Sequence, residues 1–279
     1  MKLPGNIFLV GAAKAGTTKL ADMLDLHPSI CLAKTKEPDY YSNKIFNDRN
    51  DDWYDSQFLD QKAVRLDAST SYSMGWGGSS ENIAKRIVHY NPNCQLIYIY
   101  RDPATRAWSS YWHSVRAGSE KRKYEEALVD LDCQHFQASR YLARMDEYSK
   151  HVPLKNIHIL RFEDFIKFPT EYARALLKRL ELEDFEYDTY QTAKKENESY
   201  TWGSSFGFVK LLPFELIQKI NSAIKACFPK SFHAFLKRLL SKPVEKLPAA
   251  LKSELTKKFE KELNEFETKY SDNIIKLDK

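Results

Sequence analysis

Short apolar runs alternate with segments of helical periodicity over the first two thirds of the chain. Four of these runs are expected to form buried strands. They are Ile7–Val10, Val64–Asp67, Gln95–Tyr100 and Ile157–Phe162. The segments between them repeat apolar residues every three or four positions, which is typical of amphipathic helices. Strands that alternate with helices predict βαβ units and a mostly parallel sheet, with ligands bound at the carboxyl ends of the strands.

The pattern changes from about residue 200, where strand-like runs are no longer seen. Leu211–Phe228 and Ser231–Leu240 have helical patterns, and Ser241–Pro248 is expected to be a connector because it contains two prolines. A long apolar stripe follows and predicts a helix that packs back on the core. The stripe consists of Leu251, Leu255, Phe259, Leu263, Phe266 and Tyr270.

These patterns predict a single domain over residues 1–279. Its core is expected at about 5–182, and a helical C-terminal extension at about 200–279. A separate C-terminal domain is less favoured, because about 80 residues with few long apolar faces would be poorly stable alone.

Composition and charge narrow the classes of function. The 279-residue chain is 43% apolar and 13% aromatic, which is typical of a globular protein. Its 43 basic and 38 acidic residues leave a net charge of +5, too balanced for the dense basic stripe of a nucleic-acid-binding protein. The charge is compatible with a small polyanionic ligand or an acidic acceptor. No stretch reaches about 18 apolar residues, so neither a membrane span nor a secretory signal is expected.

The cysteines suggest a compartment. Cys31, Cys94, Cys133 and Cys227 are scattered without Cys-x-x-Cys spacing, which favours reduced thiols and a cytoplasmic location. Neither they nor the seven histidines show the spacing of zinc ligands, so no metal site is expected. The oligomeric state is not indicated by these patterns.

A strand, a turn of small residues and a helix start follow one another in Asn6–Thr18. The two glycines of the turn let the backbone curl and come close to a ligand. Thr17 and Thr18 can cap the helix, whose free N–H groups favour an anion. Lys14 lies inside the loop, whereas a Walker A loop has its lysine directly after the second glycine. The segment therefore favours a phosphate cradle over an ordinary strand–turn–helix corner with a solvated lysine, and it does not predict an ATP–magnesium loop.

A second anion site is predicted in Ile97–Ser110. Arg101 emerges at the carboxyl end of a buried strand, and its planar guanidinium suits a phosphate. Ser109 lies two turns inside the helix that follows and can supply a hydroxyl. Two anion sites at neighbouring strand ends suit a ligand with phosphates at both ends. Taken alone, the residues also allow Arg101 to pair with Asp102 while Ser109 faces solvent.

In order and spacing, these segments resemble the family of sulfotransferases that use 3′-phosphoadenosine-5′-phosphosulfate (PAPS). The resemblance runs from about residue 6 to 182, with a weaker match at 250–277, and is shared with carbohydrate sulfotransferases of the heparan sulfate type and bacterial relatives. It implies a P-loop NTPase-like fold, in which helices flank a parallel sheet. The matching stretches are Lys14–Thr18, Leu26–Pro28, Lys36–Tyr41, Tyr100–Tyr111 and Leu160–Phe165.

The resemblance also implies roles for individual residues. Arg101 and Ser109 would hold the 3′-phosphate, and Lys14 with the helix N-terminus would stabilise the leaving phosphate without a metal. Glu37 would be the base that takes the proton of the acceptor, and Pro38 keeps it in extended backbone outside a helix. The residues expected to hold the 5′-phosphosulfate are Lys14, Ala15, Gly16, Thr17 and Thr18.

Three further residues are candidates on the acceptor side. His27 is a rival base, because aryl and steroid sulfotransferases use a histidine, although its place before Pro28 also suits a capping or packing role. Lys36 could steer an acidic acceptor or the sulfate, or be solvated. Tyr72 could form part of a wall for the acceptor.

The chain departs from the family pattern at two places. Family members often have Glu-Lys-x-Pro-x-Tyr where this chain has Asp67–Tyr72, so that Ala68 replaces the lysine. Many relatives also carry an arginine after an Asn-x-Ser stretch. Asn197–Ser205 has none, which leaves part of the nucleotide grip to the backbone and Ser204.

The predicted function is transfer of a sulfuryl group from PAPS to a hydroxyl of an acceptor, a carbohydrate by resemblance. The product nucleotide would be adenosine 3′,5′-bisphosphate (PAP). One alternative is another P-loop phosphotransferase or a nucleotide kinase, which would depend on magnesium. The other is a degenerate nucleotide-binding protein, which the replaced lysine and the missing arginine keep open.

Overall fold

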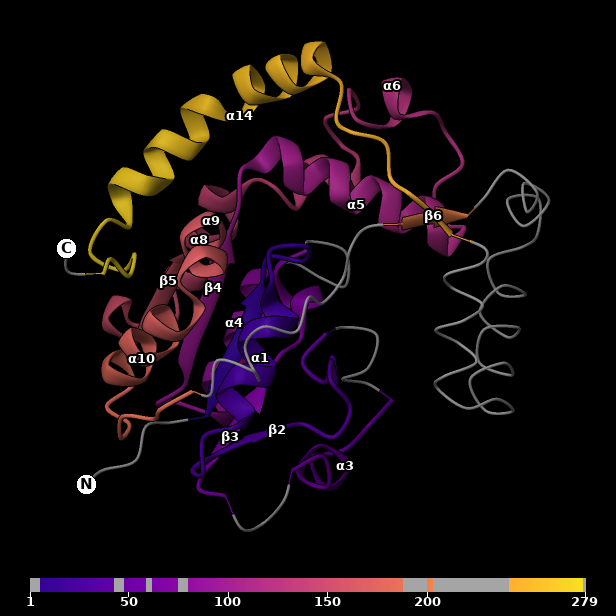
Figure 1. The fold of residues 1–279 in the computed structure, drawn as a ribbon. Coiled ribbons are helices and arrows are strands. Elements are labelled where there is room, and N and C mark those ends of the chain that lie inside the picture. The colour runs from indigo at the N-terminus through magenta and orange to yellow at the C-terminus, as the bar shows by residue number, and fades with distance from the viewer. Residues whose placement is uncertain are drawn as a thin grey trace.

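The core of the protein is a five-stranded parallel sheet with the strand order β2-β3-β1-β4-β5 (Figure 1). The strands are β1 (Ile7–Gly11), β2 (Ile30–Leu32), β3 (Val64–Asp67), β4 (Gln95–Tyr100) and β5 (Ile157–Arg161). This computed structural model describes residues 6–42, 48–58, 62–74, 80–187, 200–202 and 241–277. The side chains of Ile7, Phe8, Leu9 and Val10 are fully buried, as expected for a parallel strand that is covered on both faces.

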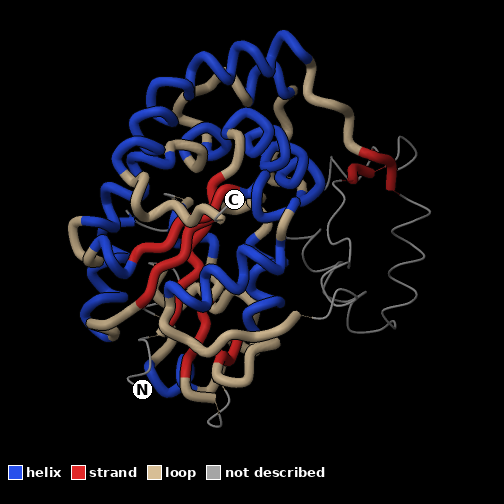
Figure 2. The backbone as a smooth tube through the Cα atoms, turned by 60° about the vertical axis from the view of Figure 1, so that its left-hand side comes forward, coloured by secondary structure: helices blue, strands red, loops and turns tan. Residues whose placement is uncertain are grey.

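Helices flank the sheet on both sides, which confirms the predicted fold class (Figure 2). The longer ones are α1 (Thr17–Asp25), α4 (Ser80–Tyr90), α5 (Pro103–Ala117), α8 (Tyr141–Ser149) and α10 (Pro169–Arg179). The shorter ones are α3 (Asp51–Asp55), α6 (Tyr124–Ala127), α7 (Gln134–Gln137), α9 (Phe162–Lys167) and two 3₁₀ turns at Thr70–Ser73 and Leu154–Asn156. Helix α1 packs against α10, and α4 packs against α8.

The predicted C-terminal helix is confirmed as α14 (Ala249–Lys269), which arches over α5 and α8 (Figure 1). Leu255, Phe259 and Phe266 of the predicted stripe are buried. The chain after α14 then extends the sheet beside β5: Ile159 N–H donates to Asn273 O at 2.9 Å, and Ile275 N–H donates to Ile159 O at 2.8 Å. The end of the described chain is therefore tied to the core.

Some sequence predictions need correction. Strand β2 was not predicted, because three residues are too short for a visible pattern, and Phe162 begins α9 instead of ending β5. The expectation of no strands beyond residue 200 is wrong, since β6 (Tyr200–Trp202) and β7 (Ser241–Pro243) form an antiparallel pair. Ser204 and the helices predicted at 211–228 and 231–240 lie outside the described residues.

Three further findings concern the described part of the chain alone. None of its helices is long and apolar enough to cross a membrane. Within the same residues, no group of three or more His, Cys, Asp or Glu side chains could hold a metal ion. The described cysteines Cys31, Cys94 and Cys133 are buried and form no disulfide with one another.

Candidate functional site

The loop after β1 lies where the order of the sheet reverses. β1 pairs with β3 on one side and with β4 on the other, so the carboxyl ends of β1 and β4 border the crevice in which open parallel sheets bind ligands. The predicted phosphate loop and Arg101 follow these two strands directly. The fold thus brings together the two anion sites that were predicted from separate segments.

The phosphate loop requires a glycine at position 16. Gly16 has a φ of 82°, and a Cβ atom added there would lie 3.0 Å from the ring of Phe162. Lys14 also has a positive φ, 71°. Ala15 N–H donates to Ala12 O at 3.1 Å and closes the turn. Helix α1 starts at Thr17, so its N-terminus lies beside the loop, as anion binding requires.

Arg101 reaches the phosphate loop. Its Nη1 donates to Lys14 O at 3.1 Å, and its guanidinium lies over the Phe162 ring, 4.5 Å from the ring centroid. The Asp102 carboxylate caps α5 by accepting from Thr105 N–H at 2.9 Å. Ser109 is half-buried on the same helix. Arg101 therefore lies beside the loop, as the hypothesis of paired anion sites requires.

Arg106 of helix α5 donates a hydrogen bond to the backbone of the phosphate loop, and the sequence analysis did not single it out. Its side chain is fully buried, with Nε donating to Ser139 Oγ at 2.6 Å and Nη1 donating to Ala13 O at 3.4 Å. The remaining nitrogen, Nη2, donates to His135 O. A buried guanidinium needs such acceptors to offset its lost hydration. The visible signal was an arginine among apolar residues on a predicted helix.

The positive groups gather around Lys14. Its Nζ lies 3.5 Å from His113 Nδ1, which also accepts from Arg116 Nη2 at 2.8 Å. Lys36 Nζ donates to Thr18 Oγ1 at the start of α1. Burial lowers the pKa of Lys14 to about 8, and the charges of Arg116, Lys36 and Arg101 add to the effect. Since like charges repel, this arrangement favours a ligand with several negative charges.

His113 and Arg116 also escaped the sequence analysis. They follow Ser109 on α5 at intervals of four and three residues, so they extend the same face of the helix. That spacing was the signal that could have found them. Arginine can only donate hydrogen bonds, so Nδ1 of His113 is an acceptor and the ring is neutral.

Glu37 faces this cationic group from the segment after β2. Thr70 Oγ1 donates to its Oε2 at 3.2 Å. Burial raises the pKa of Glu37, the charge of Asp39 raises it further, and Lys36 opposes both. The charge of Glu37 also raises the pKa of Lys14, so the carboxylate lies within electrostatic reach of the loop. The structure therefore brings the predicted base and the predicted phosphate lysine into one site.

Two candidate residues have other roles in the structure. His27 is buried, and both ring nitrogens are used: Nδ1 accepts from Ser29 N–H at 3.1 Å, and Nε2 donates to Glu183 O at 3.1 Å. This matches the packing alternative. Tyr72 is fully buried and donates to Asp67 Oδ2 at 2.9 Å, so it cannot line a wall for the acceptor.

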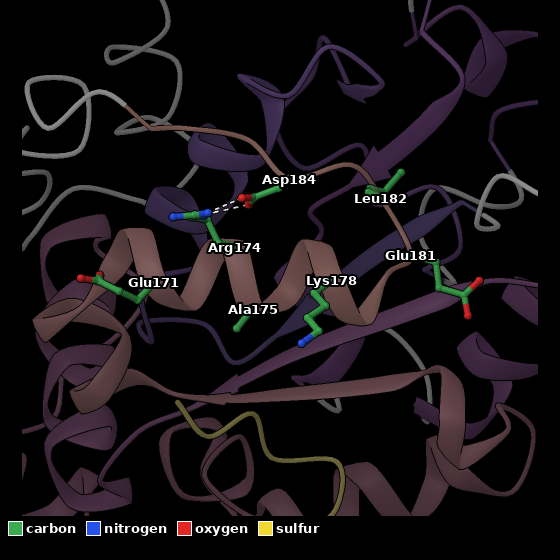
Figure 3. A pocket seen from close by; sticks show the side chains of 7 residues that line it. All are labelled: Glu171, Arg174, Ala175, Lys178, Glu181, Leu182 and Asp184. Carbon is green, nitrogen blue, oxygen red and sulfur yellow. Dashed lines mark hydrogen bonds and ion pairs between the residues drawn. The ribbon is translucent and has the colours of Figure 1, made fainter. Parts of the chain in front are cut away.

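An open pocket of about 760 Å³ lies elsewhere, over α10 and the segment that follows it (Figure 3). Arg174 and Asp184 form an ion pair at its edge, with Nε donating to Oδ1 at 2.8 Å. None of the residues that line it belongs to the phosphate loop or to the Glu37 segment. The pocket is thus separate from the candidate site.

A family profile covers most of the chain. The profile described as "Sulfotransferase domain" matches residues 4–238. The chain belongs to this family. The match includes β1 with the phosphate loop, the Glu37 segment and β4 with Arg101, so the family assignment and the candidate site rest on the same part of the sulfotransferase domain.

Two named relatives share at most 27% sequence identity with this chain over the matched residues. Mouse heparan sulfate glucosamine 3-O-sulfotransferase 5 is 27% identical over 195 residues, which are 65% of this chain and 54% of the mouse protein. The Caenorhabditis briggsae bifunctional heparan sulfate N-deacetylase/N-sulfotransferase 1 is 22% identical over 206 residues, 66% of this chain and 23% of that protein. This sulfotransferase domain thus spans about half the length of the first relative and less of the second.

A solved structure supports the fold. The crystal structure of a sulfotransferase from Alicyclobacillus acidocaldarius superposes with a TM-score of 0.66 and covers 97% of both chains. Its sequence identity to this chain is 20%. At that level of identity the likeness shows a shared sulfotransferase fold.

Proposed function

We propose that this sulfotransferase-family chain moves a sulfuryl group from PAPS to a hydroxyl of an acceptor. The observation that carries the proposal is the meeting of Lys14, Lys36 and Arg101 at the carboxyl ends of β1 and β4, opposite the half-buried Glu37. Cations on one side suit a donor with phosphates at both ends. A carboxylate on the other side suits removal of a proton.

Each group then has a chemical task. The phosphate loop and the N-terminus of α1 would bind the 5′-phosphosulfate, and Arg101 with Ser109 would bind the 3′-phosphate. In the reaction, the acceptor oxygen forms a bond to sulfur while the bond from sulfur to the 5′-phosphate oxygen breaks. That oxygen keeps the electron pair, and Lys14 stabilises its charge. The acceptor proton passes to Glu37, and PAP is released.

Glu37 is preferred to His27 as the base because of their hydrogen bonds. Both nitrogens of His27 are held by backbone groups, so proton transfer would require breaking part of the fold. The Thr70 hydroxyl donates to one carboxylate oxygen of Glu37, Oε2, and the raised pKa of Glu37 makes it a better proton acceptor than an ordinary carboxylate.

The acceptor class is proposed from the relatives. Two named relatives act on heparan sulfate according to their names, which favours a carbohydrate acceptor. The name of the 3-O-sulfotransferase favours a hydroxyl of that carbohydrate. A screen with labelled PAPS, simple glycosides, heparosan oligosaccharides and aliphatic alcohols, with mass detection of products, tests this point. Sulfation of the alcohols but of no sugar would contradict it.

Binding of the product tests the donor. We expect PAP to bind with 1:1 stoichiometry in calorimetry performed in EDTA, because the cations around Lys14 supply the positive charge that a metal would otherwise give. ATP is the control ligand. Tighter binding of ATP, and only with magnesium, would favour the alternative of a nucleotide kinase.

Arg101 should distinguish the two ends of the donor. Arg101→Ala is expected to weaken PAP by about 10- to 100-fold, the loss typical of one charge-assisted contact. Adenosine 5′-phosphosulfate lacks the 3′-phosphate and should be affected little. Calorimetry with both ligands measures the difference. Equal weakening of both would mean that Arg101 acts through Lys14 O, to which it donates, and serves the shape of the loop.

A further inference from the structure

Asp39 lies two residues after Glu37, and Pro38 between them restricts the backbone that joins the two carboxylates. Asp39 has a φ of 54°, in the left-handed region that non-glycine residues occupy only when their surroundings hold them there. The residues that follow, Tyr40 and Tyr41, are buried, so the loop enters the core directly after Asp39.

Three consecutive hydroxyl residues after β3 hold this loop from the opposite side. Asp39 N–H donates to Ser69 Oγ at 3.0 Å, and Ser71 Oγ donates to Asp39 Oδ1. Between them, Thr70 Oγ1 donates to Glu37 Oε2 at 3.2 Å. The segment Ser69–Ser71 therefore holds both carboxylates, Glu37 and Asp39, through hydrogen bonds.

The hydroxyl residues are anchored in turn by a buried carboxylate. Ser69 Oγ donates to Asp67 Oδ1 at 2.5 Å, and Tyr54 and Tyr72 donate to Asp67 Oδ2 at 3.0 and 2.9 Å. Asp67 is the last residue of the core strand β3. A chain of hydrogen bonds thus connects the sheet through Ser69 to the backbone of Asp39.

We propose that Asp39 is a positioning residue whose charge, held by the Ser69–Ser71 segment that also holds Glu37, gives Glu37 the basicity needed to take the acceptor proton, a role that rests on the proposed sulfuryl transfer. Asp39 acts through its charge, because a nearby carboxylate makes a second one hold its proton more tightly. A stronger base assists proton transfer more effectively. A residue that only completes a turn would need the left-handed backbone but no charge.

The groups around Glu37 determine the sign of the effect. Burial raises its pKa, and the charge of Asp39 raises it further. The Thr70 hydrogen bond and the charge of Lys36 oppose this increase, and Lys14 faces Glu37 from the phosphate loop. When the charge of Asp39 is removed, the two lysines remain. The pKa of Glu37 must then fall, and its titration must move to lower pH.

Asp39→Asn tests the proposal, because asparagine also tolerates a positive φ and can accept the Ser71 hydrogen bond. The readout is the titration of the Glu37 carboxyl carbon in ¹³C NMR of the free protein, assigned by its absence in Glu37→Gln. We expect the midpoint to move to lower pH by about one pH unit, the order of magnitude for two water-screened charges a few ångströms apart. With PAPS and an acceptor, kcat should fall about threefold as the base weakens.

A matched control is Asp184→Asn, which removes an exposed carboxylate that pairs with Arg174 on α10 and should leave the Glu37 titration unchanged. An unchanged titration in a folded Asp39→Asn would overturn the proposal. Should that variant unfold, Ser71→Ala replaces it. Loss of the Ser71 hydrogen bond raises the pKa of Asp39, so that Asp39 carries less negative charge in the acid range where Glu37 titrates. The Glu37 titration should therefore again move to lower pH, and an unchanged midpoint would overturn the proposal.

The NMR readout separates this inference from the proposed function. It needs neither donor nor acceptor, so it remains valid even if wild-type protein fails to turn over PAPS. Failure of PAP binding and turnover in the wild type would remove the proposed sulfuryl transfer. A shifted Glu37 titration would then still establish the coupling of the two carboxylates.

Discussion

Lys14→Ala is expected to lower kcat for sulfuryl transfer by about 10²–10³-fold, the usual loss when one preorganised donor to a developing charge is removed. Lys14 lies in the turn between β1 and α1, where its Nζ is directed by His113 and flanked by other cations. Alanine removes the ammonium, so that the backbone N–H groups of the loop alone would stabilise the charge on the departing phosphate. Single-turnover measurements with saturating PAPS isolate the chemical step.

Two control variants are compared with Lys14→Ala. Lys252→Ala removes an exposed lysine of α14 and should leave turnover unchanged. Lys14→Arg keeps a charge that does not titrate and should retain part of the rate. Near wild-type turnover of Lys14→Ala, with PAPS still bound, would show that this lysine takes no part in the reaction.

The pH dependence offers a second test of Lys14. Burial and the neighbouring charges lower its pKa to about 8, and the charged form is the one that stabilises the leaving phosphate. In the free enzyme kcat/KM should therefore fall as pH rises through about 8. Lys14→Arg should lose this alkaline limb. A limb that persists unchanged in Lys14→Arg would assign it to another group.

The parts of the site that the sequence predicted are those carried by contiguous segments. Lys14 and Arg101 each follow a short apolar run, and parallel strands place their carboxyl ends at one edge, so their meeting follows from the strand pattern. The order of the strands decided the rest. β3 and β4 lie on opposite sides of β1, so that β1 and β4 are neighbours. Local sequence patterns do not encode this order of strands.

The missed parts depend on contacts between distant segments. Thr70 reaches Glu37 across 33 residues of sequence, and Arg106 reaches Ala13 across 93. Tyr72 was misinterpreted for a related reason. A tyrosine beside a site can face the ligand or the core, and here the buried Asp67 carboxylate, which needs donors, determines that it faces the core.

Glu37→Gln is expected to lower kcat by about 10²–10⁴-fold, the typical contribution of a positioned base, and to leave the affinity for PAP nearly unchanged. Glutamine keeps the shape of the side chain and can still accept the Thr70 hydrogen bond. Its amide cannot take a proton from the acceptor. Calorimetry with PAP and steady-state kinetics on the same preparation separate binding from chemistry, and Glu171→Gln on α10 is the control.

The acid side of the pH–rate profile should change with this substitution. Burial and Asp39 raise the pKa of Glu37, and only the ionised form can act as a base, so wild-type activity should rise with pH through that raised pKa. Glu37→Gln should lose this acid limb. His27→Asn decides between the two bases. If Glu37→Gln stays active while folded His27→Asn binds PAP and is inactive, the base is His27, and the bonds that hold its ring to Ser29 and Glu183 must open during the reaction.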